Sequence, residues 1–289
     1  MRPVTMHGLA AALLAVLLLG SPTLPAAAQD GLPDSADLSL ELIDPEFLRV
    51  CADPNNLPFS NQQGEGFENE IAELLAEKLG KQVDYTWFPQ VTGFVRNTLG
   101  AHKCDVIIGY PQGDEIVQNT NPYYRTSYAL VFVPGKGLDG IESLADPRLA
   151  EAKIGVVAGT PPGDHLVRHG LIDQVRSYPL LVDTRVDSAA RSMVQDLQAG
   201  TIDVGILWGP MAAHYARTVD PELRMVPLLQ EPDRPRLIYN ITMGVRASDQ
   251  EWKRALNRLI RANQKEIDAI LLDHGVPLLD QRNRPITAP

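Results

Sequence analysis

Short apolar runs and helically spaced apolar residues alternate along this chain. Residues 47–52 form a short, mostly apolar run that is long enough for one strand. Residues 67–79 carry apolar side chains at i, i+4, i+7, i+8 and i+12, and Gly80 follows, which predicts an amphipathic helix. Residues 53–61, between the two, are rich in Asp, Asn, Pro and Ser and predict a loop. Open α/β sheets bind ligands at the carboxyl ends of their strands, so this loop is the first candidate site.

The same alternation continues along the chain and then starts again. A strand at 83–88, a helix around 94–99 and a buried strand at 105–109 complete a βαβαβ unit with parallel strands and right-handed crossovers. A second block is expected to contain strands at 153–158, 180–183 and 202–207, and helices after residues 160 and 188.

Two extended runs, at about 128–135 and 231–240, would connect the two blocks. We therefore predict an α/β fold with two lobes, two extended hinge crossings and a cleft between the lobes. A chain of 289 residues has the length at which one core usually splits into two. The expected parts are a signal peptide at 1–28, a first lobe at 42–132 plus 236–276, a second lobe at 133–235 and a tail at 277–289.

The first 28 residues have the pattern of a secretory signal. Arg2 precedes an apolar run from Leu9 to Leu19, and small residues lead to Ala28, where we expect cleavage. The apolar run is too short for a membrane helix, and the residue after Ala28 is not the cysteine that a lipoprotein would carry. We predict a periplasmic protein without a membrane anchor.

The chain is acidic, with a formal net charge of −10. Such a surface does not suit nucleic acid or anionic lipid, but it suits a basic protein partner. Cys51 and Cys104 fall at the end of one predicted strand and the start of another. Because parallel neighbours would hold these ends several residues apart, beyond disulfide reach, we predict no bridge between them.

The sequence shows none of the motifs of a nucleophile elbow, a Walker loop, a dinucleotide fold or a zinc protease. We therefore predict no catalytic residues and no cofactor. His165 and His169 have the i, i+4 spacing that can hold a metal, but no third ligand accompanies them in sequence. The simpler interpretation is two ordinary histidines on a helix surface, so no metal site is predicted.

Polar and aromatic residues cluster where the predicted strands end, as expected of a ligand pocket. The candidate cleft residues are Asp53, Asn55, Asn56, Phe59, Trp87, Gln90, Tyr110, Gln112, Arg125, Thr160, Asp164, Asp187, Ser188 and Trp208. Each has an alternative role: the Asp and Asn of the first loop can simply build turns, and Trp87 can equally belong to the core. Their convergence on strand ends favours the cleft.

At these motifs the chain resembles the periplasmic extracellular solute-binding proteins of the polar amino-acid type, family 3. The matching segments are Leu-Arg-Val-x-x-Asp-x-x-x-x-Pro-Phe at 48–59, Cys-Asp-Val-Ile-Ile-Gly at 104–109 and Ile-Gly-Val-Val-Ala-Gly-Thr at 154–160. The resemblance implies the type II periplasmic binding-protein fold.

One branch of this family is more similar still. Cys-Ala-Asp-Pro-Asn-Asn-Leu-Pro-Phe-Ser-Asn at 51–61 and Pro-Tyr-Tyr-Arg-Thr-Ser-Tyr at 122–128 resemble the MoxJ/XoxJ proteins, which accompany methanol dehydrogenases that use pyrroloquinoline quinone (PQQ). The resemblance implies a non-enzymatic periplasmic accessory protein that assists assembly or activation of the dehydrogenase. Its implied partners are the dehydrogenase and, as a further candidate, the associated cytochrome c.

The chain departs from the amino-acid binders at two positions. The Arg that clamps the ligand carboxylate after the third strand is replaced by Gly113-Asp114-Glu115, and Trp208 stands where an Asp would hold the ammonium group. Losing a buried charged partner costs ~2–5 kcal/mol, which takes a micromolar ligand toward millimolar affinity. Arg125 could replace the clamp, although a structural role at the hinge is the favoured interpretation.

Two alternatives to the accessory protein remain open. One is a transporter's solute-binding protein for a small solute other than an amino acid, held in the cleft. The other is an enzyme similar to cyclohexadienyl dehydratase, with Asp53 or Asp187 as the acid, although the missing Arg argues against it.

Overall fold

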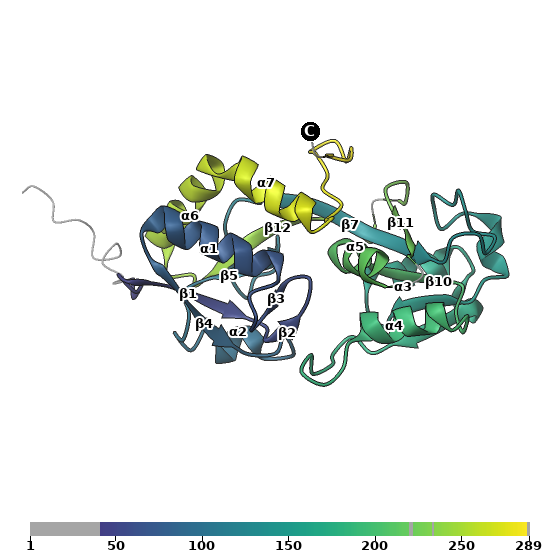
Figure 1. Cartoon of the computed structure of the whole chain (residues 1–289), viewed down its shortest axis with the longest axis horizontal. Helices are drawn as coiled ribbons and strands as arrows, with labels where there is room; N and C mark the ends of the chain where they lie inside the picture. The colour runs from purple at the N-terminus through teal and green to yellow at the C-terminus, as the bar shows by residue number, and fades with distance from the viewer. Residues whose placement is uncertain (1–40, 220–221, 233, 288–289) are drawn as a thin grey trace, which may run out of the picture. The chain divides into compact units, whose positions relative to one another are not determined.

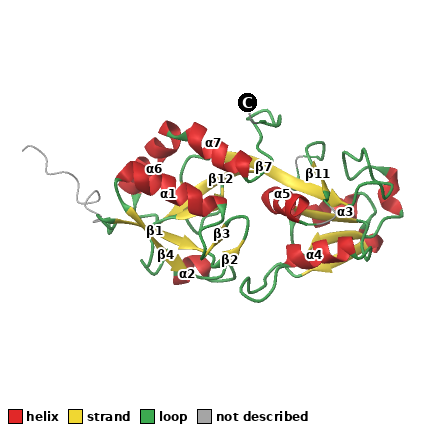
Figure 2. Cartoon of the chain, in the orientation of Figure 1, coloured by secondary structure: helices red, strands yellow, loops and turns green. Residues whose placement is uncertain are grey.

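The computed structural model describes residues 41–287, apart from 220–221 and 233. The expected signal peptide, residues 1–28, lies outside the described residues. Figure 1 shows the described elements, and Figure 2 shows that helices and strands alternate through most of the chain. The mixed α/β arrangement confirms the predicted fold class, with two lobes and two crossings. The predicted limits of the lobes stay a prediction.

The first lobe contains a sheet with helices packed on it. Its strands are β1 (Phe47–Ala52), β2 (Asn55–Asn56), β3 (Ser60–Asn61), β4 (Gln82–Trp87), β5 (Ile107–Pro111) and β6 (Gln118–Asn119). Its helices are α1 (Phe67–Leu79), α2 (Phe94–Asn97), α6 (Gln250–Ala262) and α7 (Gln264–Asp273). β1 pairs in parallel with β4, and Val50 forms a parallel bridge with Val106 just before β5, so the predicted parallel order is confirmed.

Helix α1 packs its apolar face into the core of the first lobe. Phe67, Ile71 and Leu75 fall on one face of the helix and are fully buried. The ring of Phe67 makes an edge contact with Phe59, with ring centroids 5.4 Å apart. The residue before the helix, Gly66, must be a glycine because a Cβ there would lie 2.1 Å from the carbonyl oxygen of Phe59. This packing fixes the loop 53–61 against the start of α1.

The second lobe repeats the plan with a different sheet order. It contains β8 (Ile154–Val157), β9 (Val175–Tyr178), β10 (Val204–Trp208), β11 (Arg224–Pro227), α3 (Pro161–Arg168), α4 (Ala189–Gln198) and α5 (Gly209–Thr218), with short 3-10 turns at Pro147–Ala150 and Ile172–Gln174. β10, β8 and β9 are parallel neighbours. Gly155 and Gly205 let Met193 of α4 lie close to the sheet, since a Cβ on Gly205 would approach its sulfur to 2.7 Å.

Two strands run between the lobes. β7 (Tyr124–Phe132) and β12 (Ile238–Val245) are antiparallel, with Ser127 opposite Ile238. The segment that the sequence assigns to a tail packs against β7: Leu279 is buried and donates its N–H to the carbonyl of Arg125 at 2.9 Å.

Two predictions about bonding and secondary structure are wrong. Cys51 and Cys104 form a disulfide, with Cα atoms 5.4 Å apart. The parallel register that was expected to separate them begins only at Val106, because the chain bends at Asp105 and turns Cys104 back toward β1. Residues 180–183 belong to a loop, and the strand of this region is β9, whose polar edge sequence gave no clear apolar run.

A buried ionic cluster stabilises the end of the first-lobe sheet. The Asp105 carboxylate is fully buried and lies 2.8 Å from the Arg49 guanidinium and 2.7 Å from that of Arg246. Arg246 also pairs with Asp249 at 2.6 Å. A fully buried carboxylate is tolerated because two cations and their hydrogen bonds satisfy it.

Candidate functional site

The first candidate residue, Asp53, lies at the carboxyl end of β1 and is fully buried. Its carboxylate accepts the N–H of Asn55 at 2.9 Å and the N–H of Gln90 at 2.7 Å. The hydroxyl of Thr184, from the second lobe, lies 2.7 and 2.9 Å from its two oxygens. The protein's own donors therefore occupy the Asp53 carboxylate, which the sequence had suggested as a ligand-binding group.

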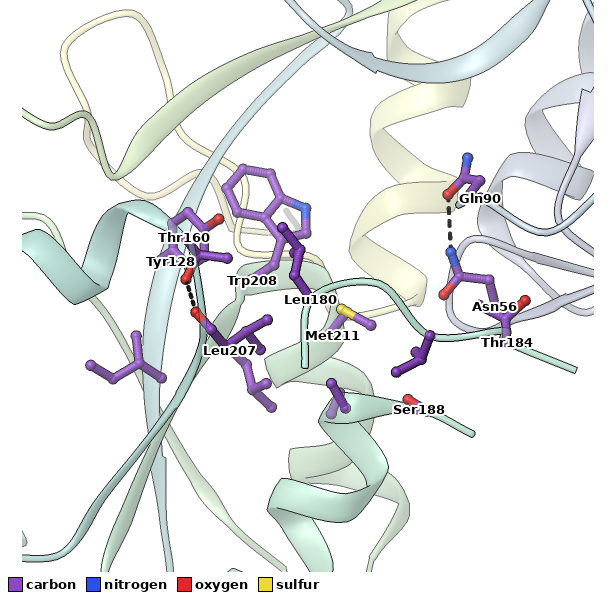
Figure 3. A pocket seen from close by; sticks show the side chains of 15 residues that line it. Asn56, Gln90, Tyr128, Thr160, Leu180, Thr184, Ser188, Leu207, Trp208 and Met211 are labelled. Atoms are coloured by element: carbon purple, nitrogen blue, oxygen red, sulfur yellow. Dashed lines mark hydrogen bonds between the residues drawn. The ribbon is translucent and has the colours of Figure 1, made fainter. Parts of the chain in front are cut away.

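A second contact between the lobes lies beside the first. The amide of Asn55 donates to the carbonyl oxygen of Thr184 at 2.7 Å. Within the first lobe, the amide of Asn56 donates to the side-chain oxygen of Gln90 at 3.1 Å (Figure 3). Residues 53–56 and Thr184 thus hold the two lobes together at one edge of a pocket.

The pocket has a volume of about 220 Å³ and is lined by both lobes. Its lining residues are Asn56, Gln90, Tyr128, Val157, Thr160, Leu180, Val182, Thr184, Ser188, Ala189, Ala190, Ile206, Leu207, Trp208 and Met211 (Figure 3). Among the described residues, no lining side chain is charged. Pockets for drug-sized ligands have roughly 300–1,000 Å³, so this one suits only a small, uncharged molecule.

Aromatic rings form one wall of the pocket. The Trp208 ring makes edge contacts with Tyr128, at 5.1 Å between centroids, and with Tyr239, at 5.8 Å. Burial raises the pKa of the Tyr128 phenol well above its usual value, so it stays protonated. Trp208 ends β10 and directly precedes α5, so an aromatic ring lies at this strand end.

A buried acid lies near Asp53. Glu68, in the first turn of α1, is 6 % exposed, and burial first and the charge of Asp53 second raise its pKa to about 8. Gly109 leaves room for this side chain, because a Cβ there would lie 1.9 Å from Glu68 Oε1. Glu68 was not among the predicted site residues, because it lies within the helix expected at 67–79 and the candidates were taken from strand ends.

Five predicted cleft residues line the pocket: Asn56, Gln90, Thr160, Ser188 and Trp208. Asn55 lines an adjoining hollow of about 200 Å³ with Thr184 and Arg191. Tyr110 lines a larger hollow, of about 540 Å³, with Gln90 and Leu181.

The other predicted residues lie elsewhere. Phe59 and Trp87 pack against the first-lobe core, with Trp87 stacked on Tyr85 at 4.5 Å. Asp164 and Asp187 are exposed and are absent from the described pocket lining, and the Asp187 carboxylate accepts the N–H of Ser188.

Arg125 and Gln112 belong to the hinge region. The Arg125 guanidinium donates to Asn240 of β12 and to Asn283, each at 2.9 Å. Gln112 accepts the Asn240 amide at 2.8 Å. These contacts hold the Arg125 side chain against β12 and the C-terminal segment, and Arg125 is absent from the described pocket lining.

Sequence reasoning missed several lining residues and one histidine environment. Tyr128 lies within a crossing strand and so was not a candidate. Thr184 directly follows the strand expected at 180–183, but the candidates chosen after that strand were Asp187 and Ser188. The description of His165 and His169 as helix-surface histidines is wrong for His165, which is fully buried. No residue pattern in the neighbouring sequence predicts that Tyr128 and Thr184 line the pocket or that His165 is buried.

A pocket between two α/β lobes joined by antiparallel crossings defines a periplasmic binding protein of type II. Residues 48–272 match the bacterial extracellular solute-binding proteins, family 3, and the chain belongs to this family. No described helix has both the length and the apolar character that a membrane crossing would need.

Three relatives show where in the family the similarity is high. The chain is 32 % identical to Protein MoxJ of Methylorubrum extorquens over 285 residues, covering 93 % of this chain and 94 % of the relative. It is 41 % identical to the crystal structure of the periplasmic binding protein XoxJ from Methylobacterium extorquens AM1, with a TM-score of 0.70 and coverage of 81 % and 100 %. MxaJ from Methlophaga aminisulfidivorans MPT is 28 % identical, with a TM-score of 0.71 and coverage of 80 % and 100 %.

Proposed function

We propose that this chain is a periplasmic accessory protein of methanol oxidation that assists assembly or activation of a PQQ-dependent methanol dehydrogenase by protein contact. Its similarity to MoxJ, XoxJ and MxaJ over most of the chain supports this proposal. The associated cytochrome c is a further candidate partner. In this proposal the chain has no catalytic residues and no cofactor of its own.

The observation that carries the proposal is the uncharged pocket. A free amino acid needs a cation for its carboxylate and an anion for its ammonium group, yet no charged side chain lines the pocket in the described part of the chain. The buried carboxylate of Asp53 accepts hydrogen bonds from three residues, one of them Thr184. A zwitterion would lose its water without charged partners in return, which disfavours nutrient capture.

The loop at the mouth of the pocket supports contact with another protein. Residues 179–188 leave three large apolar side chains in solvent, Leu180, Leu181 and Val186, which are 51, 61 and 82 % exposed. Ile116, 70 % exposed, lines the same hollow as Leu181. Clustered exposed apolar residues mark interaction surfaces more often than chance exposure does. The acidic net charge of −10 adds attraction to a basic partner surface.

The direct test is calorimetric titration of the chain into methanol dehydrogenase at low salt. We expect saturable binding that weakens as salt rises, because screening reduces attraction between charged surfaces. Val186→Asp should weaken binding about tenfold or more by placing a charge in an apolar contact. Ile172→Asp, at a position that is 51 % exposed elsewhere on the second lobe, is the matched control and should bind normally. No binding at low salt would refute the proposal.

A second candidate is a transporter's solute-binding protein for a small solute other than an amino acid. The pocket of about 220 Å³ between the lobes favours it, because its aromatic wall and amide groups can still hold an uncharged molecule. A true ligand at 100 times its dissociation constant adds ~2.7 kcal/mol to the free energy of unfolding. A screen of small alcohols, aldehydes and amides without any rise in melting temperature would remove this candidate.

An enzyme similar to cyclohexadienyl dehydratase is the least supported alternative. It needs a general acid and a carboxylate clamp in the cleft, but Asp53 is fully hydrogen-bonded and Asp187 is exposed away from the pocket. We expect no turnover of prephenate or arogenate, and measured turnover would contradict the non-enzymatic assignment.

A further inference from the structure

Two histidines and a glutamate meet in the second lobe, away from the pocket. His165 lies within α3, and His169 is the residue that ends it, so the i, i+4 spacing brings both imidazoles to the same side of the helix. Glu231, from the loop after β11, reaches that side although it is 62 positions from His169. One ligand atom of each residue lies within 4.8 Å of the other two.

The carboxylate of Glu231 is oriented by a backbone amide. Its Oε1 accepts the N–H of Leu144 at 2.6 Å. Its Oε2 lies 3.2 Å from Nε2 of His169 and 3.9 Å from Nδ1 of His165. The side chain of Glu231 is 3 % exposed. One oxygen is therefore fixed by the protein, and the other is presented to both imidazoles, which is how supporting hydrogen bonds orient metal-binding carboxylates.

The His165 imidazole is fixed in one tautomer. Its Nε2 lies 2.8 Å from the carbonyl oxygen of Pro235, which can only accept, so Nε2 carries the proton and the neutral ring has its lone pair on Nδ1. Nδ1 is buried and has no hydrogen-bond partner, and Glu231 Oε2 is too distant to be one. A buried lone pair that faces a carboxylate oxygen leaves a gap that favours a cation.

We propose that His165, His169 and Glu231 bind a divalent transition metal of the zinc class. Tetrahedral zinc with ligand bonds of about 2.0–2.2 Å separates its ligand atoms by roughly 3.3 Å. The separation of 3.2 Å already fits, and that of 3.9 Å needs a shift of about half an ångström. Two imidazoles exclude calcium and magnesium, which take oxygen ligands. The His169 side chain is 25 % exposed, so water can reach this end of the site and would supply the fourth ligand.

The site would link two segments that the sequence separates. α3 belongs to the second-lobe sheet, whereas Glu231 and Pro235 precede β12, one of the two crossings. A bound metal would hold the chain onto α3 just before it returns to the first lobe. This role does not depend on the proposed partner.

The test is calorimetric titration of zinc into the full chain, prepared without a histidine tag and treated with a chelator. We expect one zinc ion per chain, and His169→Gln should weaken binding by about tenfold or more, since even the loss of a supporting group costs a metal site that much. His274→Gln is the matched control, because His274 also pairs with a carboxylate, that of Glu70 at 2.8 Å, but that pair contains only one imidazole. The His274→Gln variant should bind zinc as tightly as the wild type does.

Cobalt(II) gives a measurement that needs no variant. The wild-type chain should develop the strong visible d–d absorption of a tetrahedral site, and zinc should displace it. Circular dichroism checks that His169→Gln is folded. Absence of saturable zinc binding by the wild type, unchanged affinity in His169→Gln, or an equal loss in His274→Gln would each overturn the proposal.

Discussion

Replacing Glu68 by Gln should stabilise the protein at neutral and alkaline pH but not in acid. The folded protein holds the pKa of Glu68 at about 8, against 4.5 for an unperturbed glutamate, chiefly because burial disfavours the charged form. Above pH 4.5 the unfolded chain releases this proton while the folded chain keeps it, so the unfolded state binds fewer protons. The free energy of unfolding therefore falls as the pH rises from 4.5 to 8.

The size of the effect follows from the two pKa values. Each pKa unit corresponds to 1.36 kcal/mol, so the wild type loses about 3 kcal/mol by pH 7 and about 5 kcal/mol above pH 8 relative to acid. Glu68→Gln cannot ionise and removes this loss. The difference in free energy of unfolding between the variant and the wild type should grow by these amounts as pH rises.

Urea unfolding followed by tryptophan fluorescence at several pH values measures this difference. Glu73→Gln, on the exposed side of the same helix, controls for the effect of the substitution on helix propensity. A difference between Glu68→Gln and the wild type that stays constant from pH 4.5 to 8 would refute the reasoning. It would mean that Glu68 is ionised in the folded protein and has partners that compensate for its burial.

The remaining predictions concern covalent, ionic and hydrogen-bonded links. Replacing Cys51 and Cys104 by Ala should lower the free energy of unfolding by about 4 kcal/mol, because the bridge closes a loop of 53 residues; guanidinium unfolding measures it, and an unchanged midpoint would contradict the bridge. Asp105→Ala should lower it by about 3–5 kcal/mol, since it leaves the buried Arg246 without a main partner, and a near-neutral result would be inconsistent with the burial described. Thr184→Ala removes the hydroxyl that donates to the buried Asp53 carboxylate and should lower the free energy of unfolding by about 1.5–3 kcal/mol. Amide hydrogen exchange at residues 53–56 should become faster, and unchanged exchange would show that this contact does not hold the lobes together.

Elements with a strong local pattern were predictable from the sequence. The helix expected at 67–79 coincides with α1, because its apolar spacing and the glycine after it are local signals. The strand at 83–88 is displaced from β4 by only one residue. Recognisable segments spread over both lobes then gave the fold and the family, which the match over residues 48–272 bears out.

Contacts between distant residues were not predictable in the same way. Thr184 reaches Asp53 across 131 positions, and nothing near either residue signals the pair. The disulfide depended on a bend at Asp105 that the apolar pattern around it does not contain. Glu231 joins His165 and His169 only because the loop before β12 folds over α3. Each is set by how elements pack, whereas sequence periodicity reports only which face of an element is buried.

The contact between the C-terminal segment and β7 affects how this protein should be handled. Leu279 and Asn283 both form hydrogen bonds with Arg125 of β7. The end of the described chain is therefore attached to one of the two strands that run between the lobes. A shortened version ending at Val276 would lose both contacts, and β7 would be held only by its pairing with neighbouring strands and helix α5 packed on it. Measurements of lobe opening, partner affinity or solute binding made on such a version would therefore describe a more mobile connection between the lobes than the full chain has.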